Sequence, residues 1–332
     1  MATKTTVQAV KGTRDFYPET MAFRSWLYGK VQEISRRFGY QEYEAPLLER
    51  LELYAAKSGE ELVKEQSFVF NDRGGDQLTL RPELTPSLAR MIAQRQKQMI
   101  FPQRWWSWGP FWRYERPQKG RYREFFQWNI DLLGVDSPEA DAELVAIGAE
   151  FLRQVGLAPH QVRFLVNNRR LMDAVFEKLG IPAGRRPEVS GLIDRRDRMS
   201  EQEWENYAGE IGLSVGQLDG LKENLANENL WQESDELVRF FEAIDALGAR
   251  PYVEFAPHVV RGLLYYTGTV FEAWDQDGEF RAILGGGRYD NLVADVGGDP
   301  LSAVGFAMGD LVMSLVLKRY NALPSGLEAS PA

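Results

Sequence analysis

The segment from residue 113 to residue 131 carries the densest set of side chains able to do chemistry. It reads R-Y-E-R-P-Q-K-G-R-Y-R-E-F-F-Q-W-N-I-D. Arginine presents a planar fork of donors that matches a phosphate or a carboxylate, and lysine presents a point charge. One interpretation is a phosphate-binding site, and the other is a solvated hairpin with surface ion pairs. The cations are Arg113, Arg116, Lys119, Arg121 and Arg123.

The second half of this segment, residues 124–133, is expected to be a strand, in which successive side chains point to opposite faces. One face is apolar and should be core: Phe126, Trp128 and Ile130. The other face offers a ring, two amides and a carboxylate: Phe125, Gln127, Asn129 and Asp131. This second face suits a purine stacked on Phe125, a phosphate on Arg113 and a polar substrate at Gln127 and Asp131.

Two polar residues, Glu83 and Thr85, lie at an expected junction between a strand and a helix. Side chains at such junctions can project into a cleft, and a carboxylate there suits an ammonium group. Capping of the helix by Glu83 or Thr85 is the alternative reading.

A third polar segment, residues 260–272, places Arg261 close to Tyr265 and Tyr266. An arginine beside phenol hydroxyls can clamp a carboxylate or a phosphate, although it could equally pair with a structural carboxylate. Residues 285–290 read G-G-G-R-Y-D. The spacing of a P-loop is missing, so the glycines indicate close backbone approach, here to a ligand.

The elements that must position these residues alternate between helices and hairpins. Apolar spacing predicts helices at 18–38, 85–94 and 311–320, with Asp310 as a cap of the last one, and Ser137 predicts another helix start. Residues 169–247 are expected to be mostly helical. Strands are predicted at 40–48, 68–70, 78–81, 105–115, 124–133, 162–166, 252–255, 269–274, 279–284 and 302–308. Because most of them form hairpins, the sheet should be mainly antiparallel in an α+β fold.

Composition excludes several classes of protein. The 332 residues include no cysteine and only two histidines, so disulfides, cysteine zinc sites and a histidine-rich metal site are excluded, and no metal ligand is proposed. The sequence also lacks a G-x-S-x-G motif, the turn that carries the nucleophilic serine of α/β-hydrolases. The sequence has no long apolar run of the kind that predicts a membrane helix. Its polar N-terminal segment lacks the apolar core of a signal peptide, so a cytoplasmic location is expected. The net charge of −9 means that any nucleic acid must dock on a local basic patch.

Taken together, the ordered segments resemble the histidyl-tRNA synthetases, which are class II aminoacyl-tRNA synthetases. The opening K-G-T-R-D-F-Y-P-E at 11–19 resembles the start of that family. Residues 39–46 look like class II motif 1, 113–131 like motif 2, and 302–309 like the start of motif 3, while 260–272 and 285–290 resemble two histidine-specific signatures. The resemblance spans about residues 8–320 and implies an antiparallel sheet flanked by helices, active as a homodimer.

The resemblance implies roles for single residues. Glu83, Thr85 and Gln127 would hold the histidine ammonium, and Asp131 with Tyr266, beside Tyr265, would read the imidazole. ATP, with Mg²⁺, would be bound by Arg113 and Phe125, and Arg261 would be the catalytic arginine beside Arg113. Arg288 and Arg121 are the nearest candidates to bind ATP in place of an arginine that motif 3 usually supplies, and the sequence does not choose between them. Arg116 and Gln118 would approach the acceptor end of the histidine tRNA. These assignments follow from the matching positions in residues 80–90, 113–131, 260–272 and 285–290.

Three departures from the family pattern bear on the expected function. The usual motif 3 arginine is missing from Gly309-Asp310-Leu311-Val312-Met313, Leu264 replaces an aspartate, and no anticodon-binding domain is expected after Tyr320. We expect a catalytic core of residues 1–168 and 250–322, a helical insertion at 169–249 and a linker or tail at 323–332. The alternative function is the histidine-sensing regulatory subunit of ATP phosphoribosyltransferase, which shares this fold and does not activate histidine.

Overall fold

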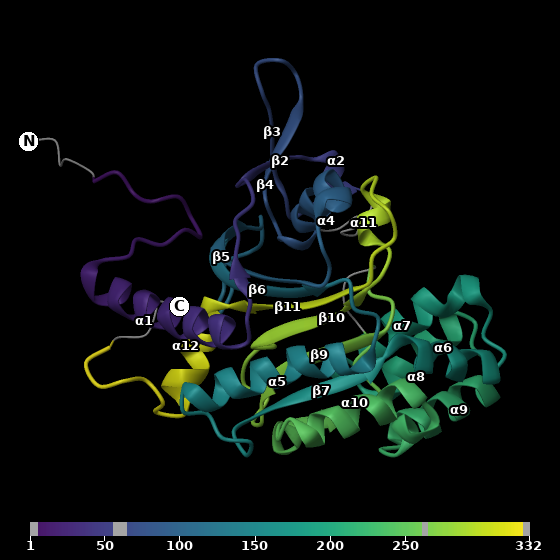
Figure 1. Cartoon of the computed structure of the whole chain (residues 1–332). Coiled ribbons are helices and arrows are strands. Elements are labelled where there is room, and N and C mark those ends of the chain that lie inside the picture. Colours follow the sequence, from purple (N-terminus) through teal and green to yellow (C-terminus); the bar gives the residue numbers. More distant parts are fainter. Residues whose placement is uncertain (1–5, 56–64, 261–264, 328–332) are drawn as a thin grey trace, which may run out of the picture.

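The computed structural model describes residues 6–55, 65–260 and 265–327. At its centre lies an eight-stranded sheet with the order β1-β5-β6-β11-β10-β9-β7-β8 (Figure 1). Its neighbouring strands are antiparallel except for the parallel pairs β1–β5 and β7–β8. The predicted α+β class and mainly antiparallel sheet are therefore confirmed. The strands are β1 (Gln41–Glu42), β5 (Gln103–Trp112), β6 (Glu124–Leu133), β7 (Val162–Asn168), β8 (Val253–Phe255), β9 (Thr269–Asp275), β10 (Leu284–Tyr289) and β11 (Ala303–Gly309).

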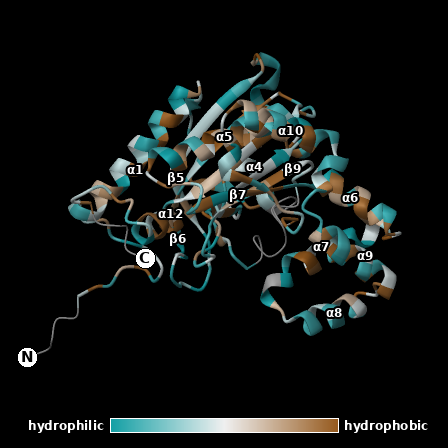
Figure 2. Ribbon diagram, turned by 90° about the horizontal axis from the view of Figure 1, so that it is seen from below, coloured by the Kyte–Doolittle hydropathy of each residue, from teal (hydrophilic) through white to brown (hydrophobic). Residues whose placement is uncertain are grey.

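One face of this sheet is apolar, as the alternation along β6 predicts. Trp128 and Ile130 are fully buried in the main core, and the Trp128 ring lies 5.2 Å from the ring of Phe151 in helix α5. Helix α5 (Pro138–Gln154) begins after Ser137, whose hydroxyl accepts a hydrogen bond from the Ala140 amide. Figure 2, seen from below, shows α5 and α10 (Asp235–Ala246) lying along this side of the molecule. The opposite face of β6 is left for polar side chains.

A second, three-stranded sheet with the order β2-β4-β3 lies beside the large one. Its strands are β2 (Leu48–Arg50), β3 (Phe68–Asn71) and β4 (Gln77–Leu80). The hairpin expected at 68–81 is confirmed, but the single strand expected at 40–48 is wrong. Its first part, β1, lies at an edge of the large sheet, and its second part, β2, joins the small sheet. Pro46 lies between the two parts, and because proline has no N–H to donate, it suits a break in the ladder.

Helices cover the remaining surfaces. Helix α1 (Pro18–Arg37) buries Phe23, Leu27, Val31 and Ile34 as its apolar spacing predicts. Helix α10 packs against α5, while α7, α8 and α9 form a lobe beside the sheet with its own core around Trp204 and Leu192 (Figures 1 and 2). The expected helical character of residues 169–247 is therefore confirmed. The other helices are α2 (Glu52–Ala55), α4 (Thr85–Arg95), α6 (Arg169–Lys178), α7 (Arg186–Asp194), α8 (Glu201–Glu210), α9 (Val215–Ala226), α10 (Asp235–Ala246), α11 (Leu292–Asp295) and α12 (Asp310–Arg319), with 3₁₀ turns at 96–98, 183–185, 196–198, 230–233 and 250–252.

Two further expectations are corrected near the C-terminal end of the sheet. The strand expected at 279–284 begins at Leu284 and continues through the three glycines to Tyr289, so these glycines lie within a strand. Asp310 begins α12 without capping it. Its carboxylate instead accepts hydrogen bonds from the Arg14 guanidinium at 2.8 Å and from the Phe126 amide at 3.0 Å. Across the described residues, no helix is long and apolar enough to pass through a membrane.

Candidate active site

A cavity of about 380 Å³ opens on the polar face of the large sheet. Its floor comes from β6, β11, β10 and β9, and small residues on the middle strands leave room above them. Opposite Asp131, Asn129 and Gln127 on β6 stand Gly305, Ala307 and Gly309 on β11. A Cβ atom on Gly305 would lie 2.0 Å from Oδ1 of Asp131, so only glycine fits at that position.

One wall of the cavity carries Glu83, between β4 and α4. Its carboxylate Oε2 accepts a hydrogen bond of 2.9 Å from the Tyr265 hydroxyl, which also bonds the side chain of Thr85. Glu83 is 4% exposed. The N-cap of α4 is Leu84, without a side-chain bond, so capping is not what Glu83 and Thr85 do here. This wall therefore offers a buried carboxylate beside two hydroxyl groups, which is a site for a cationic amine.

A second buried carboxylate, Asp131, lies among tyrosines. Tyr289 donates a hydrogen bond of 2.6 Å to its Oδ1, and Tyr266 lines the same cavity. Burial raises the pKa of Asp131 to about 7, and the Tyr289 hydroxyl opposes this rise. Burial also raises the pKa of Tyr266, with the charges of Glu83 and Asp131 adding to the effect. An acid in this setting can accept an N–H from a ligand ring such as imidazole.

The other end of the cavity holds Arg113 and Phe125. The Arg113 Nε atom donates a hydrogen bond of 3.0 Å to the Pro82 carbonyl, and its guanidinium carbon lies 5.3 Å from the centre of the Phe125 ring. Burial lowers the pKa of Arg113, and the nearby Glu83 carboxylate opposes the shift. Phe125 itself stacks on Phe111, with ring centres 6.0 Å apart. A fixed cation beside an aromatic ring is suited to a phosphate attached to a planar base.

The loop between β5 and β6 lies over this end. Arg121 lines the cavity, but its guanidinium forms an ion pair with Glu115, which is 9% exposed. Arg116 and Gln118 lie on the exposed part of the loop and are not among the residues that line the cavity. The backbone of Gln118 pairs with that of Arg121 in a tight turn. The loop therefore presents Arg116 and Gln118 to a ligand outside the cavity.

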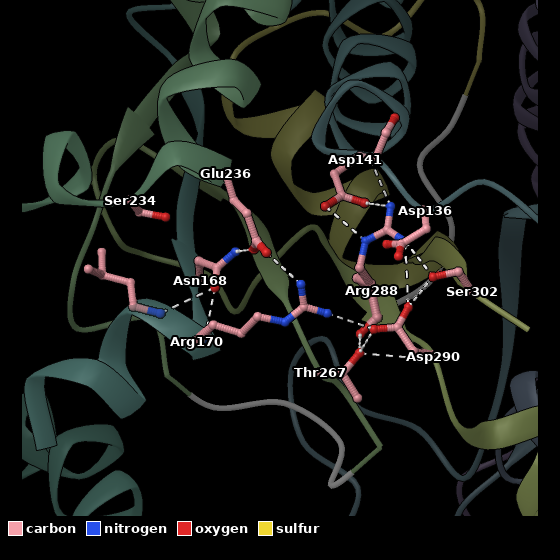
Figure 3. A network of polar contacts seen from close by, with 12 residues as sticks. Asp136, Asp141, Asn168, Arg170, Ser234, Glu236, Thr267, Arg288, Asp290 and Ser302 are labelled. Carbon is pink, nitrogen blue, oxygen red and sulfur yellow. Dashed lines mark hydrogen bonds and ion pairs between the residues drawn. The ribbon is translucent and has the colours of Figure 1, made fainter. Parts of the chain in front are cut away.

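Arg288 does not line the cavity. It is 3% exposed and reaches through the opposite face of β10 to α5, where its Nη2 atom lies 2.6 Å from Asp141. Figure 3 shows Arg288 between Asp141 and Ser302, whose hydroxyl accepts a hydrogen bond of 3.0 Å from Nη1. Its Nη atoms also donate to the carbonyl groups of Val135 and Ser137. Since these partners engage the whole guanidinium, the geometry gives no support to the expected contact with ATP.

The same network fastens the helical segment to the cavity wall. Figure 3 shows Arg170 between Glu236 of α10 and Asp290, whose carboxylate accepts a hydrogen bond of 2.6 Å from Thr267. The neighbouring Arg169 donates a hydrogen bond of 2.9 Å to the backbone carbonyl of Tyr266. Helix α6 thus fixes the backbone that carries the cavity tyrosines. Arg261, expected to be catalytic, lies outside the described residues.

The structure thus brings together, around one cavity, residues that are far apart in the sequence. Those expected from the sequence are Glu83, Thr85, Arg113, Arg121, Phe125, Gln127, Asp131, Tyr265 and Tyr266. Tyr289 also lines it and was not expected there, and so does Asn129, which was placed on the polar face of its strand without a role. Strand alternation was the available signal, because Tyr289 shares a face with Gly285 and Gly287, and Asn129 shares one with Gln127 and Asp131.

The sequence and the fold are similar to those of known proteins. A family model described as histidyl-tRNA synthetase matches residues 12–310. A chloroplastic/mitochondrial histidine–tRNA ligase of Arabidopsis thaliana is 39% identical over 331 residues, which are 97% of this chain and 68% of the plant protein. The solved histidyl-tRNA synthetase of a Nostoc species has a TM-score of 0.83 at 22% identity, over 97% of this chain and 77% of that one. A Bacillus halodurans structure, titled ATP phosphoribosyltransferase regulatory subunit/histidyl-tRNA synthetase, has a TM-score of 0.81 at 23% identity, over 96% of this chain and 83% of that one. At these identities the two structures show the fold alone.

Proposed function

The chain belongs to the histidyl-tRNA synthetase family, and we propose that it activates histidine with ATP and transfers it to the 3′ end of its tRNA. The observation that carries this proposal is the division of one cavity into two chemically different ends. Two buried carboxylates with tyrosine partners occupy one end, and an arginine beside an aromatic ring occupies the other. An amino acid with two basic groups fits the first end, and a nucleotide fits the second.

Histidine lies across the acidic end in this proposal. Its ammonium group binds Glu83, with Thr85 and Gln127 beside it, and its imidazole binds Asp131 and Tyr266. The Tyr265 hydroxyl fixes the Glu83 carboxylate, since it already donates to Oε2 at 2.9 Å. A site that hydrogen-bonds the ring nitrogens rejects analogues without them, because its own buried polar groups would then lack partners.

ATP occupies the other end, with its α-phosphate on Arg113 and its adenine against Phe125. An oxygen of the histidine carboxylate attacks the α-phosphorus and forms a new P–O bond. The P–O bond to the β-phosphate breaks, and pyrophosphate leaves. This step needs no nucleophile from the protein, only positioning and stabilisation of negative charge. Arg121 would bind the ATP phosphates after its ion pair with Glu115 breaks. Mg²⁺ would enter bound to ATP, since it is held chiefly by phosphate oxygens and by few protein carboxylates.

The assay that tests the proposal is histidine-dependent exchange between ATP and pyrophosphate. Arg113→Ala should lower the exchange rate about 10²- to 10³-fold, the usual loss for one charge-stabilising donor. Arg116→Ala, in the exposed loop, is the matched control and should leave exchange unchanged while weakening tRNA charging. Arg261→Ala should keep histidine binding and lose exchange by the same order as Arg113→Ala. A chain that binds histidine and forms no adenylate would instead act as a histidine-sensing regulatory subunit.

The working unit in this proposal is a homodimer in the cytoplasm. Its catalytic core is residues 1–168 and 250–322, with residues 169–249 as a helical insertion and 323–332 as a tail. Two exposed apolar side chains follow the edge strand β1 in the chain and support a partner surface there: Leu47 and Leu48, which are 41% and 46% exposed. Exposed apolar side chains beside an edge strand favour contact with another chain. Sedimentation should give about twice 37.9 kDa, and Leu47→Lys should shift the mass toward one chain.

A further inference from the structure

Asn129 is a buried polar residue that the proposed reaction does not use. It lies in the middle of β6 and lines the cavity, between Gln127 and Asp131 on the same face. The residue is 4% exposed, and its amide nitrogen Nδ2 has no hydrogen-bond partner among the described residues. Since a buried donor without a partner costs free energy, such a group in a cavity calls for a ligand atom that accepts a hydrogen bond.

The space above Asn129 is open because the sheet beside it has small residues. Across β11 its neighbour is Ala307, and across β10 the next residue is Gly285, which faces Glu272 on β9. The cavity is lined by all four of these residues: Asn129, Ala307, Gly285 and Glu272. The amide of Asn129 therefore faces room for a ligand.

The chemistry of the neighbouring residues selects the ligand group. Asp131 and Gln127 each lie two residues from Asn129, roughly 7 Å along the strand. In the proposed function, Asp131 accepts from the imidazole, and Glu83 with Gln127 takes the ammonium. The group of histidine that remains is its carboxylate, which only accepts hydrogen bonds and needs a donor. Asn129 supplies a donor between the two subsites.

We propose that Asn129 is a further substrate-binding residue, whose side-chain amide donates a hydrogen bond to the carboxylate of the amino acid. This inference rests on the proposed function for the placement of histidine. The same oxygen becomes the acyl oxygen of the adenylate when the other carboxylate oxygen attacks phosphorus. The contact therefore persists through the reaction and orients the attacking carboxylate.

Equilibrium binding of two probes tests the contact, histidine and histidinol, which has a CH₂OH group in place of the carboxylate. Asn129→Ala should weaken histidine binding roughly tenfold or more, because a bond to a charged group is lost. Asn129→Asp, of the same shape, should weaken it further, since two carboxylates would then face each other. Asn129→Ala should not change the affinity for histidinol or for ATP more than about twofold.

The matched control is Ser107→Ala. Ser107 is buried, stands opposite Asn129 on β5, does not line the cavity, and has a hydroxyl without a partner among the described residues. It should leave histidine binding unchanged. An equal loss in Ser107→Ala would mean that a buried water joins the two side chains, and it would overturn the proposal. Equal losses for histidine and histidinol, or a loss confined to ATP, would also overturn it.

These outcomes are independent of whether the chain makes an adenylate. If the unmodified protein binds histidine but exchanges no pyrophosphate, the proposed catalysis fails. The binding test of Asn129 still gives its answer in that case. Conversely, normal exchange in Asn129→Asp with unchanged histidine affinity leaves the catalytic proposal standing and removes Asn129 from the site.

Discussion

The buried carboxylate of Asp131 should make the stability of the empty protein fall as the pH rises. Burial raises its pKa from 3.8 to about 7, and its hydrogen-bond partner is the uncharged phenol of Tyr289. The folded chain therefore binds this proton more tightly than the unfolded chain does. The stabilising contribution is complete below the unfolded pKa and is lost as the pH rises through the folded pKa.

The size of the effect follows from the two pKa values. A difference of about 3 pKa units at 1.36 kcal/mol each corresponds to about 4 kcal/mol of unfolding free energy. Of this amount, about 2 kcal/mol is lost between roughly pH 5.5 and pH 8.5, where the protein can be assayed. Asp131→Asn keeps the shape and removes the charge. The unliganded variant should therefore gain about 2 kcal/mol relative to the unmodified protein over that interval.

Urea denaturation of both proteins at several pH values, without histidine, measures this difference. Asp219→Asn on the exposed face of α9 is the control and should follow the unmodified protein at every pH. Asp131→Asn should also lose histidine binding, so that it is more stable and less functional at high pH. Parallel stability curves for Asp131→Asn and the unmodified protein would refute the reasoning, because they would mean that the carboxylate is ionised without cost.

Two other predictions come from residues of the neighbouring strands β11 and β10. Gly305→Ala places a Cβ atom 2.0 Å from Asp131 Oδ1, so the KM for histidine should rise about 10- to 100-fold. Gly29→Ala on the exposed side of α1, whose Cβ meets nothing within 4 Å, should leave it unchanged. Arg288→Met should cost roughly 3–5 kcal/mol of unfolding free energy by leaving the Asp141 charge buried and unpaired, with no loss of ATP affinity. Reduced ATP binding at full stability would restore the expected role of Arg288 in binding the nucleotide.

The fold could be predicted where local pattern and long-range packing agree. The period of two along β6 identified the buried Trp128 and Ile130, and the spacing along α1 identified its core face. The pattern failed where one residue interrupts it, as at Pro46, or where glycine gives no hydrophobic signal, as in β10. A run of three glycines looks like a loop to any reading based on side chains. Its pairing with β9 and β11 becomes visible only in three dimensions.

The site was less predictable because its contacts join distant segments. Asp310 looked like a helix cap, but its carboxylate binds Arg14, which lies 296 residues earlier in the chain. Nothing in the neighbouring sequence signals such a pair. Glu83 was compatible with capping or with a ligand, and the choice depended on Tyr265, 182 residues away. Local sequence identifies groups able to do chemistry, while the partner of each group decides whether that chemistry is available.

Two adjacent residues of β10 make this dependence on partners explicit. Arg288 and Tyr289 point to opposite faces of the strand, and each contacts a buried aspartate, Asp141 and Asp131 respectively. Burial raises both carboxyl pKa values, to about 6 and about 7. The arginine neutralises Asp141 and ties it to the framework, so that acid can offer little to a ligand. A phenol donates one hydrogen bond without supplying a positive charge, so Asp131 keeps its affinity for a basic ring. The same strand therefore builds structure on one face and a binding site on the other.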